Sequence, residues 1–244
     1  MALDLRDPQS IISTGQETLR RMASVDNYNS WIYELMRPHL GRRIAEVGCG
    51  IGNMTEYLLG ADLLLAFDIL PESAAWVGDK FKGRPNVQVR QGDLCDAGFV
   101  TEASRLCFDT VVSINMLEHI QDDRKALSHM HTLLGRDGRL LLFVPAGPYM
   151  FGTLDISLGH FRRYDKKGLS RKVRQAGFHV EKLHYVNILG VAGWLLNSRI
   201  LRRKILPKDQ LGFFNTLAPL LQAAEKRFQP PFGQSLLCVA SKKR

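Results

Sequence analysis

Three glycines and one acid are concentrated in the stretch RIAEVGCGIGNMT, residues 43–55. Glu46 lies inside a short apolar run, which stops at Gly48. Gly50 and Gly52 follow at alternate positions. Glycine lets the backbone approach a ligand closely and adopt dihedral angles that other residues resist. The pattern predicts a short strand, a tight turn that seats a ligand, and then a helix.

The spacing of these glycines separates two classes of nucleoside ligand. Dinucleotide-binding turns have the spacing G-x-G-x-x-G and hold a pyrophosphate at a helix N-terminus. Here the spacing is G-x-G-x-G, and Glu46 precedes the first glycine by two residues. A carboxylate aimed at the turn would repel a pyrophosphate and attract an ammonium or sulfonium group. The turn therefore favours S-adenosylmethionine over NAD, although a lone glycine-rich turn can also be a simple connection.

Two aspartates end the apolar runs that follow. The run 63–67 ends at Asp68, where an acid in a βαβ unit can accept the ribose hydroxyls. The run VQVRQGDL places Asp93 at another strand end, where its carboxylate could accept the amino group of adenine. Either aspartate alone could instead cap a helix. Their common position favours ligand binding, because open α/β sheets bind ligands at the carboxyl ends of strands.

A fourth run, DTVVSINMLEHI, leads out of a buried strand into Glu118 and His119. With these four motifs in order, residues from about 27 to 178 resemble the class I S-adenosylmethionine-dependent methyltransferases. The resemblance implies that Glu46 faces the methionine amino group, Asp68 the ribose and Asp93 the adenine. It also implies S-adenosylhomocysteine as product, and further cofactor contacts from Gly48, Gly50, Gly52, Ile69, Leu94, Asn115 and Met116, the last two beside the reacting methyl.

The order of apolar runs predicts one domain over residues 1–244. Five strand–helix units are expected up to residue 146, with helices from Pro71 and over residues 121–134. The resemblance implies a Rossmann-like, doubly wound, mostly parallel sheet of seven strands, whose last strand, QSLLCVASKK, is antiparallel. A helical insertion at about residues 187–230 precedes that strand.

Cap helices are expected at the N-terminus, over about residues 1–40. Trp31, Ile32, Leu35 and Met36 have helical spacing in the segment 25–40. In the resembling family such a helix covers the cofactor, so Tyr28 or Trp31 could touch it, with core packing favoured for Trp31. Residues 1–24 have weak periodicity and are expected to form a loosely held arm.

The segment 145–164 interrupts the strand–helix alternation with a loop that should contribute to the acceptor pocket. Its GHFRRY sequence, ending at Tyr164, is similar to a segment of many bacterial methyltransferases. Methyl transfer depends on positioning the nucleophile, and a general base helps if the nucleophile is protonated. His119, His160 and Tyr164 are the candidates for that base. His119 could equally shape the pocket, and the loop residues could be structural hydrogen-bonding groups.

Composition excludes several classes of site and location. The cysteines, at 49, 95, 107 and 238, form no C-x-x-C pair, and no His/Cys cluster has metal spacing. We therefore expect a reduced cytoplasmic protein without a metal. The N-terminus has no apolar signal core, and the apolar run 188–196 is shorter than the roughly 20 residues that span a bilayer.

Charge is unevenly distributed along the chain. Residues 1–159 carry 15 Lys and Arg against 20 Asp and Glu, whereas residues 160–244 carry 18 against 4. The second part therefore favours an anionic partner, namely RNA, an anionic membrane surface or an acidic substrate, or it has a basic solvated face. The NMLE motif lacks the P-P-[YF] step of base-amino methylation and the cysteine of cytosine C5 methylation. Nucleic acid is thereby disfavoured, except for O-methylation of RNA.

The segment 187–204 places an apolar stretch before Arg199, Arg202, Arg203 and Lys204. It could lie in a membrane interface, which would make the protein peripheral to the membrane. It could instead be a lid or dimer helix, and the sequence leaves the oligomeric state open. The sequence as a whole predicts methyl transfer to an oxygen, nitrogen or carbon of a small or lipid-like metabolite. The alternatives are an RNA methyltransferase and a non-catalytic S-adenosylmethionine-binding or assembly protein.

Overall fold

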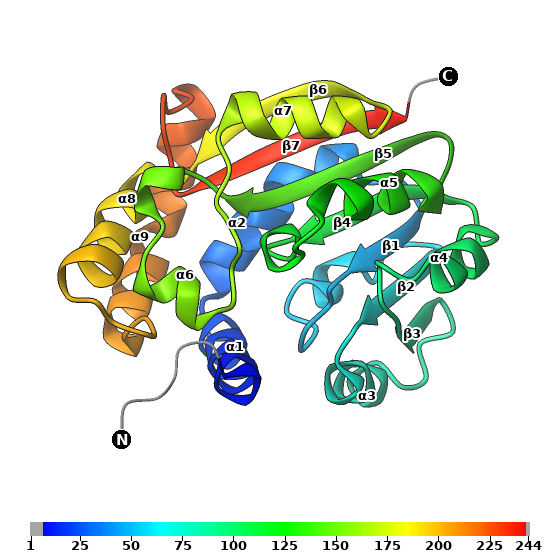
Figure 1. Cartoon of the computed structure of the whole chain (residues 1–244), viewed down its shortest axis with the longest axis horizontal. Helices are drawn as coiled ribbons and strands as arrows, with labels where there is room; N and C mark the ends of the chain where they lie inside the picture. The colour runs from blue at the N-terminus through cyan, green and yellow to red at the C-terminus, as the bar shows by residue number, and fades with distance from the viewer. Residues whose placement is uncertain (1–6, 243–244) are drawn as a thin grey trace.

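A seven-stranded sheet in the order β3-β2-β1-β4-β5-β7-β6 forms the centre of the computed structural model, which describes residues 7–242 (Figure 1). Strands β1 to β5 pair in parallel, and β7 runs antiparallel to both β5 and β6. The predicted fold class and the antiparallel last strand are confirmed. The strands are β1 (Arg43–Val47), β2 (Leu63–Asp68), β3 (Val87–Gln91), β4 (Phe108–Ile114), β5 (Leu134–Pro145), β6 (Phe178–Val186) and β7 (Ser235–Lys242).

Helices cover both faces of the sheet, with α4, α5 and α7 in front of it and α2 behind it in Figure 1. Asp96, Asp122 and Asp165 accept a backbone N–H at the starts of α4, α5 and α7, as expected of N-cap aspartates. The α-helices are α1 (Pro8–Met22), α2 (Asp26–Met36), α3 (Pro71–Lys80), α4 (Ala97–Ser104), α5 (Asp123–Leu133), α6 (Thr153–Ser157), α7 (Lys166–Gln175), α8 (Ile188–Leu195) and α9 (Lys208–Arg227).

The central strands are apolar on both faces because each face has its own core. In β1, Ala45 and Val47 belong to the core shared with α4, α5 and α7. Ile44 points to the other face, where Trp31 of α2 and Ala218 of α9 are buried. This alternation is the pleat of a strand buried on both sides, and it fixes the register of the sheet. Trp31 is a core residue, as expected.

The prediction of a helix directly after the glycine turn is wrong. The turn is followed by a short 3-10 helix, Thr55–Leu58, and β2 begins soon afterwards. Gly48, Gly50 and Gly52 have φ angles of +76°, +55° and +81°, so this stretch cannot be the first turn of a right-handed helix. Too few residues then remain before Leu63 for a full α-helix.

The N-terminal segment differs from the expected loose arm. Residues 8–22 form α1, whose first turn is capped by the Asp7 carboxylate on the Ser10 amide. The Arg21 guanidinium donates to the Leu206 carbonyl at 2.6 Å, and the Asn53 amide donates to the Leu19 carbonyl at 2.9 Å. Helix α1 therefore bridges the glycine turn and the insertion. The rest of the predicted arm, residues 1–6, lies outside the described residues.

The insertion before β7 consists of α8, a π-helical turn (Leu196–Ile200) and α9. It stands beside the sheet, at the left of Figure 1, with α6 and α1 between it and the strand ends. Trp194 and Val191 of α8 pack on Met150 and Leu154 of the loop after β5. None of the helices within residues 7–242 combines the length and apolarity that crossing a membrane requires.

Candidate active site

One cavity of about 910 Å³ opens at the carboxyl ends of the parallel strands. Its size is at the upper end of the range of about 300–1,000 Å³ for small-molecule sites. The strand ends form one side of the cavity, and α1, the loop after β5 and the insertion form the other. The cavity is lined by most of the residues predicted to bind cofactor, namely Tyr28, Glu46, Gly48, Gly50, Asp68, Ile69, Asp93, Leu94, Asn115 and Met116.

Glu46 is a buried acid at the floor of the glycine turn. Its side chain accepts a hydrogen bond from the Thr55 hydroxyl at 2.6 Å. Burial raises the pKa of Glu46 to about 8, and the nearby charge of Asp68 contributes in the same direction. Ionising a buried carboxylate is costly because it has lost its hydration. A cationic ligand group would replace that hydration, so Glu46 suits such a group.

Asp68 and Asp93 stand at the ends of neighbouring strands. The Asp68 carboxylate accepts the Gly50 amide at 2.9 Å and the Leu70 amide at 3.0 Å, so it also holds the glycine turn in place. Asp93 accepts the Cys95 amide at 2.7 Å. Both carboxylates keep further acceptor capacity toward the cavity, because each oxygen has two lone pairs.

The end of β4 has an unusual backbone. Asn115 has a φ of +48°, a region that non-glycine residues seldom adopt, and its amide donates to the Phe143 carbonyl at 2.7 Å. Such local strain is often stored at functional sites. The neighbouring Met116 side chain lies against Gly48, where any Cβ would collide with it. The strand end and the glycine turn are therefore closely packed against each other.

Gly52 does not line the cavity, contrary to the prediction. Its amide donates to the Cys49 carbonyl at 2.9 Å and closes the turn. A Cβ at this position would lie 3.2 Å from Phe81 and 3.3 Å from Val77. Gly52 thus serves the shape of the turn and its packing against α3.

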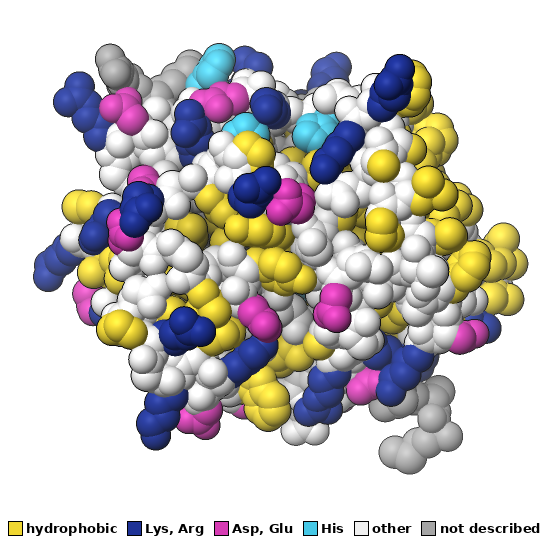
Figure 2. Space-filling view, turned by 180° about the vertical axis from the view of Figure 1, so that it is seen from behind, with side chains coloured by type: hydrophobic (Ala, Val, Ile, Leu, Met, Phe, Trp, Pro, Cys, Tyr) yellow, Lys and Arg dark blue, Asp and Glu magenta, His cyan; other side chains and the backbone are white. Residues whose placement is uncertain are grey.

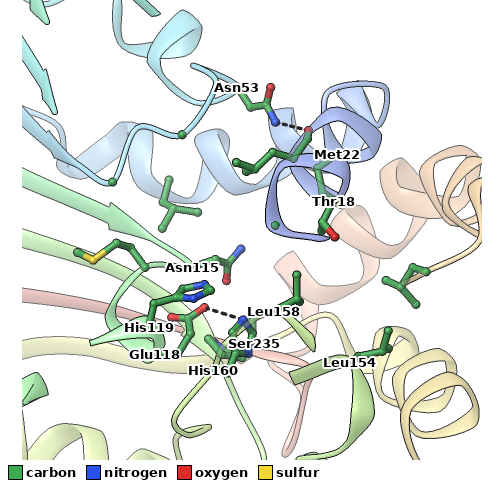
Figure 3. Close-up of a pocket in the computed structure, with 18 of the residues that line it drawn as sticks. Thr18, Met22, Asn53, Asn115, Glu118, His119, Leu154, Leu158, His160 and Ser235 are labelled. Atoms are coloured by element: carbon green, nitrogen blue, oxygen red, sulfur yellow. Dashed lines mark hydrogen bonds and ion pairs between the residues drawn. The ribbon is translucent and has the colours of Figure 1, made fainter. Parts of the chain in front are cut away.

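A cluster of three titratable side chains forms the polar end of the cavity. Figure 3 shows Glu118, His119 and His160 together, with Asn115 beside them. His160 Nε2 lies 3.9 Å from Glu118 Oε1, and the two imidazole rings meet edge to face with centroids 4.6 Å apart. The Phe161 amide donates to the Glu118 carbonyl at 2.9 Å, which joins the loop after β5 to the end of β4.

Glu118 and His119 have strongly perturbed pKa values. Burial raises the pKa of Glu118 to about 7, against the opposing charges of His160 and Arg163. The His119 ring faces the cavity but is closely surrounded by protein, and this burial, together with His160, lowers its pKa to about 3. The His119 imidazole is therefore neutral at pH 7.

Asp155 holds His160 in position from behind. Its carboxylate contacts His160 Nδ1 at 3.0 Å, Arg163 Nε at 2.7 Å and Trp194 Nε1 at 3.2 Å. Burial alone would raise the pKa of Asp155, but the hydrogen bond to His160 and the Arg163 charge hold it below its usual value. Arg163, which is itself buried, thus fixes the loop through Asp155. Asp155 was not predicted as a site residue, because its only signal in the sequence is a lone acid in a loop.

Tyr164, predicted as a candidate base, lies in the core and not at the cavity. Its side chain is buried, and its hydroxyl bonds to the Asp123 carboxylate at 3.0 Å. It does not line the cavity. Burial and the Asp123 charge raise the pKa of Tyr164, so this phenol stays protonated. The residue packs in the core because the chain turns inward after Arg163, where the Tyr164 amide pairs with the Pro145 carbonyl.

The remaining cavity wall is largely apolar. Met22 and Leu19 come from α1, Leu154 and Leu158 from the loop after β5, and Phe214 from α9. Tyr28 lies at the border with the polar strand ends, where its ring packs edge to face on Phe214. Burial raises the pKa of the Tyr28 hydroxyl to about 12, so it serves as a neutral hydrogen-bonding group.

The sheet order, the glycine turn and the acids at three strand ends define a class I S-adenosylmethionine-dependent methyltransferase domain. Residues 45–142 match the family model described as "Methyltransferase domain", so this part of the chain is similar to that family. The family prediction is therefore confirmed.

Proteins that are similar to this chain in sequence or in structure are named as methyltransferases. The chain is 32% identical over 114 residues to a malonyl-[acyl-carrier protein] O-methyltransferase of Paenibacillus sp., covering 45% of this chain and 40% of that protein. It is 27% identical over 188 residues to a probable S-adenosylmethionine-dependent methyltransferase of Mycolicibacterium smegmatis, covering 71% and 68% of the two chains. A crystal structure of a Bacillus halodurans methyltransferase has the same fold, with a TM-score of 0.60, 20% identity, and coverage of 87% of this chain and 99% of that one.

Proposed function

We propose that this protein transfers a methyl group from S-adenosylmethionine to an oxygen, nitrogen or carbon of a small or lipid-like acceptor. The observation that carries the proposal is a single cavity with two chemically different ends. One end presents the strand-end acids Glu46, Asp68 and Asp93, and the other presents Glu118, His119 and His160 beside an apolar wall. A cofactor and an acceptor would thus meet in one enclosure.

The residues at the strand ends fit the cofactor. Glu46 would neutralise its ammonium group, Asp68 would accept the ribose hydroxyls and Asp93 the adenine amino group. Gly48 and Gly50 let the backbone approach it closely, and Tyr28 covers it from α2. When bound, S-adenosylmethionine supplies an electrophilic methyl group on a sulfonium.

The histidine cluster would act on the acceptor. Held at the strand ends, the cofactor would supply its methyl carbon to the acceptor nucleophile and would keep the electron pair of the carbon–sulfur bond. A proton lost by the acceptor can pass to His160, whose Nδ1 is held by Asp155. The low pKa of His119 makes that imidazole the weaker base. Most of the rate enhancement would come from holding the nucleophile near the methyl group.

An apolar cavity wall supports a lipid-like acceptor, and the outer surface of the insertion supports contact with a membrane. Figure 2 shows hydrophobic side chains gathered at the right edge, over the insertion. Phe213, Leu220 and Ile200 each expose 69–71% of their surface there. Exposed cations such as Arg199, Arg202 and Lys208 lie in the same segment. We propose that this surface rests on an anionic bilayer and admits the acceptor from it.

Part of the positive charge that motivated an RNA substrate is used inside the protein. Arg163 pairs with Asp155 at 2.7 Å, and Arg162 and Lys172 pair with Asp123 at 2.9 Å and 2.6 Å. These pairs join the basic C-terminal third to acids from the rest of the chain. They favour the metabolite acceptor over the RNA alternative.

Transfer of a labelled methyl group would test the proposed function. The protein is incubated with methyl-labelled S-adenosylmethionine and either an aqueous metabolite extract or a lipid extract, each with and without nuclease. We expect nuclease-resistant label in a small or lipid molecule. Label that nuclease removes would favour the RNA reading, and absence of cofactor binding by calorimetry would favour a non-catalytic protein.

A further inference from the structure

The Glu118 side chain is the least satisfied polar group of the cavity. It is fully buried, and neither of its carboxylate oxygens has a hydrogen-bond partner among the described residues. An unpaired buried carboxylate is costly, so native proteins usually provide it with a donor or a cation. The Nε2 atom of His160 lies 3.9 Å from Glu118 Oε1, which is too long for a hydrogen bond.

We infer that Glu118, His119 and His160 bind one divalent first-row transition-metal ion, such as Zn²⁺. Their ligand atoms all lie within 4.8 Å of one another. Two atoms that each contact an ion at about 2.1 Å can be at most about 4.2 Å apart, so small side-chain rotations would close the site. His119 is exposed at the cavity surface and packs edge to face on His160.

The groups behind the two histidines are those expected of metal ligands. Asp155 contacts His160 Nδ1 at 3.0 Å, and the Leu158 backbone hydrogen-bonds the His119 ring. A ligating histidine nearly always donates its second ring N–H to a carboxylate or a backbone carbonyl, which aims the other nitrogen at the metal. Asp155 is in turn fixed by Arg163 and Trp194, so the His160 ring is held rigidly.

The ligand atoms of the three side chains favour some metal ions over others. Two imidazoles and one carboxylate suit zinc, iron, manganese or cobalt, whereas Ca²⁺ and Mg²⁺ prefer oxygen ligands alone. Three protein ligands leave coordination positions open, as in catalytic sites. These positions face the cavity, because all three residues line it.

The ion would hold the acceptor through an oxygen atom. A coordinated hydroxyl or enol loses its proton more readily, and that proton would leave to water in the cavity. The metal would thus activate the nucleophile in place of a histidine base. This role rests on the proposed function, whereas the metal site rests on the ligand geometry alone. The sequence predicts no metal site, because Glu118 and His119 are separated from His160 by about forty residues of chain.

Calorimetric titration with Zn²⁺ alone, and visible spectroscopy with Co²⁺ alone, would test the site. The full chain is first stripped with a chelator and dialysed. We expect about one ion per chain, and Co²⁺ absorption typical of nitrogen and oxygen ligands. Glu118→Gln, His119→Ala and His160→Ala should each abolish this binding. Asp155→Asn should weaken it about 10- to 100-fold, as for other groups that orient a ligand.

His179→Ala is the matched control, because His179 is exposed on β6, away from the cavity, and its loss should leave the stoichiometry unchanged. Thermal unfolding and S-adenosylhomocysteine binding, measured on every variant, separate loss of the site from loss of the fold. Binding that survives in His119→Ala and His160→Ala, or no binding by the folded wild type, would overturn the metal site. Methyl transfer measured on the same stripped and reloaded samples reports on the proposed function separately.

Discussion

The buried carboxylate of Glu46 makes cofactor binding sensitive to pH. Because its pKa is raised to about 8, the empty protein carries this group protonated at neutral pH, whereas an ammonium ligand needs it ionised. Affinity for S-adenosylmethionine should therefore rise with pH between about 6 and 8, by up to about tenfold per pH unit. Calorimetry across this window would measure the slope, and Glu46→Gln should flatten it.

The raised pKa of Glu46 also makes the folded protein less stable as pH rises. The folded empty protein binds the Glu46 proton more tightly than the unfolded chain, so this contribution to the unfolding free energy is lost as pH rises from about 4.5 to about 8. For cofactor binding, an affinity that still rises steeply with pH in Glu46→Gln would show that another titrating group causes the pH dependence.

Asp68 combines a cofactor role with a structural one. We predict that Asp68→Ala weakens S-adenosylhomocysteine binding by about 1.5–3 kcal/mol, the contribution of a hydrogen bond to a charged group. The variant also loses the acceptor for the Gly50 and Leu70 amides, so some loosening of the glycine turn is expected. Asp79→Ala, an exposed acid on α3, is the control. Calorimetry showing equal affinity in both variants would exclude the ribose assignment.

His160 and Tyr164 are close in sequence and should behave differently. His160→Ala is expected to lower turnover on the acceptor strongly while cofactor affinity changes little, because the side chain stands at the polar end of the cavity. Tyr164→Phe should keep turnover and lose about 1 kcal/mol of stability, from its bond to Asp123. Steady-state kinetics and denaturant unfolding would distinguish the two. A turnover defect in Tyr164→Phe would return this residue to the catalytic set.

At the scale of elements, strand ends were predictable and contacts between loops were not. Glu46, Asp68 and Asp93 could be placed together because parallel strands bring their carboxyl ends to one edge of the sheet. The contacts of His160 with Glu118 and Asp155 depend on how the loop after β5 folds back, and no periodicity encodes that. Likewise, cap helices were expected over about residues 1–40, but the weak periodicity of residues 1–24 favoured a loose arm, because α1 has no fully buried residue.

The outer face of the insertion predicts a lipid-dependent interaction. Vesicles containing anionic lipid should sediment the protein at low salt, and neutral vesicles should not, because exposed apolar and basic side chains would both be engaged. Phe213→Ser with Leu220→Ser should reduce binding, since both side chains are largely exposed and contribute little to the core. Trp76→Ser, on α3, is the control for lost apolar surface, because Trp76 is also largely exposed and lies away from the insertion. Wild-type protein that stays in the supernatant would contradict membrane contact and leave the insertion as a lid.

At the scale of the whole molecule, part of the uneven charge along the sequence is used in ion pairs between the two parts of the chain. Acids from the first two thirds of the chain meet cations from the last third at Asp123 and Asp155. The Asp155–Arg163 pair is buried, so breaking it by removing one partner should cost several kcal/mol, roughly 3–5. We expect Arg163→Met to lower the melting temperature in a thermal scan and to loosen His160 at the same time. An unchanged melting temperature would mean that the pair contributes no net stability.

Helix α1 touches both ends of the cavity while none of its side chains is fully buried. Leu19 lies over Gly50 at the glycine turn, and Ile11 lies against Gly159 in the loop that carries His160. A helix held this lightly can open without disturbing the core, and each opening would expose cofactor and acceptor together. The exchange rate of the spent cofactor would then be set by α1 rather than by the affinity of the strand-end acids, and the enzyme would release both products through the same opening.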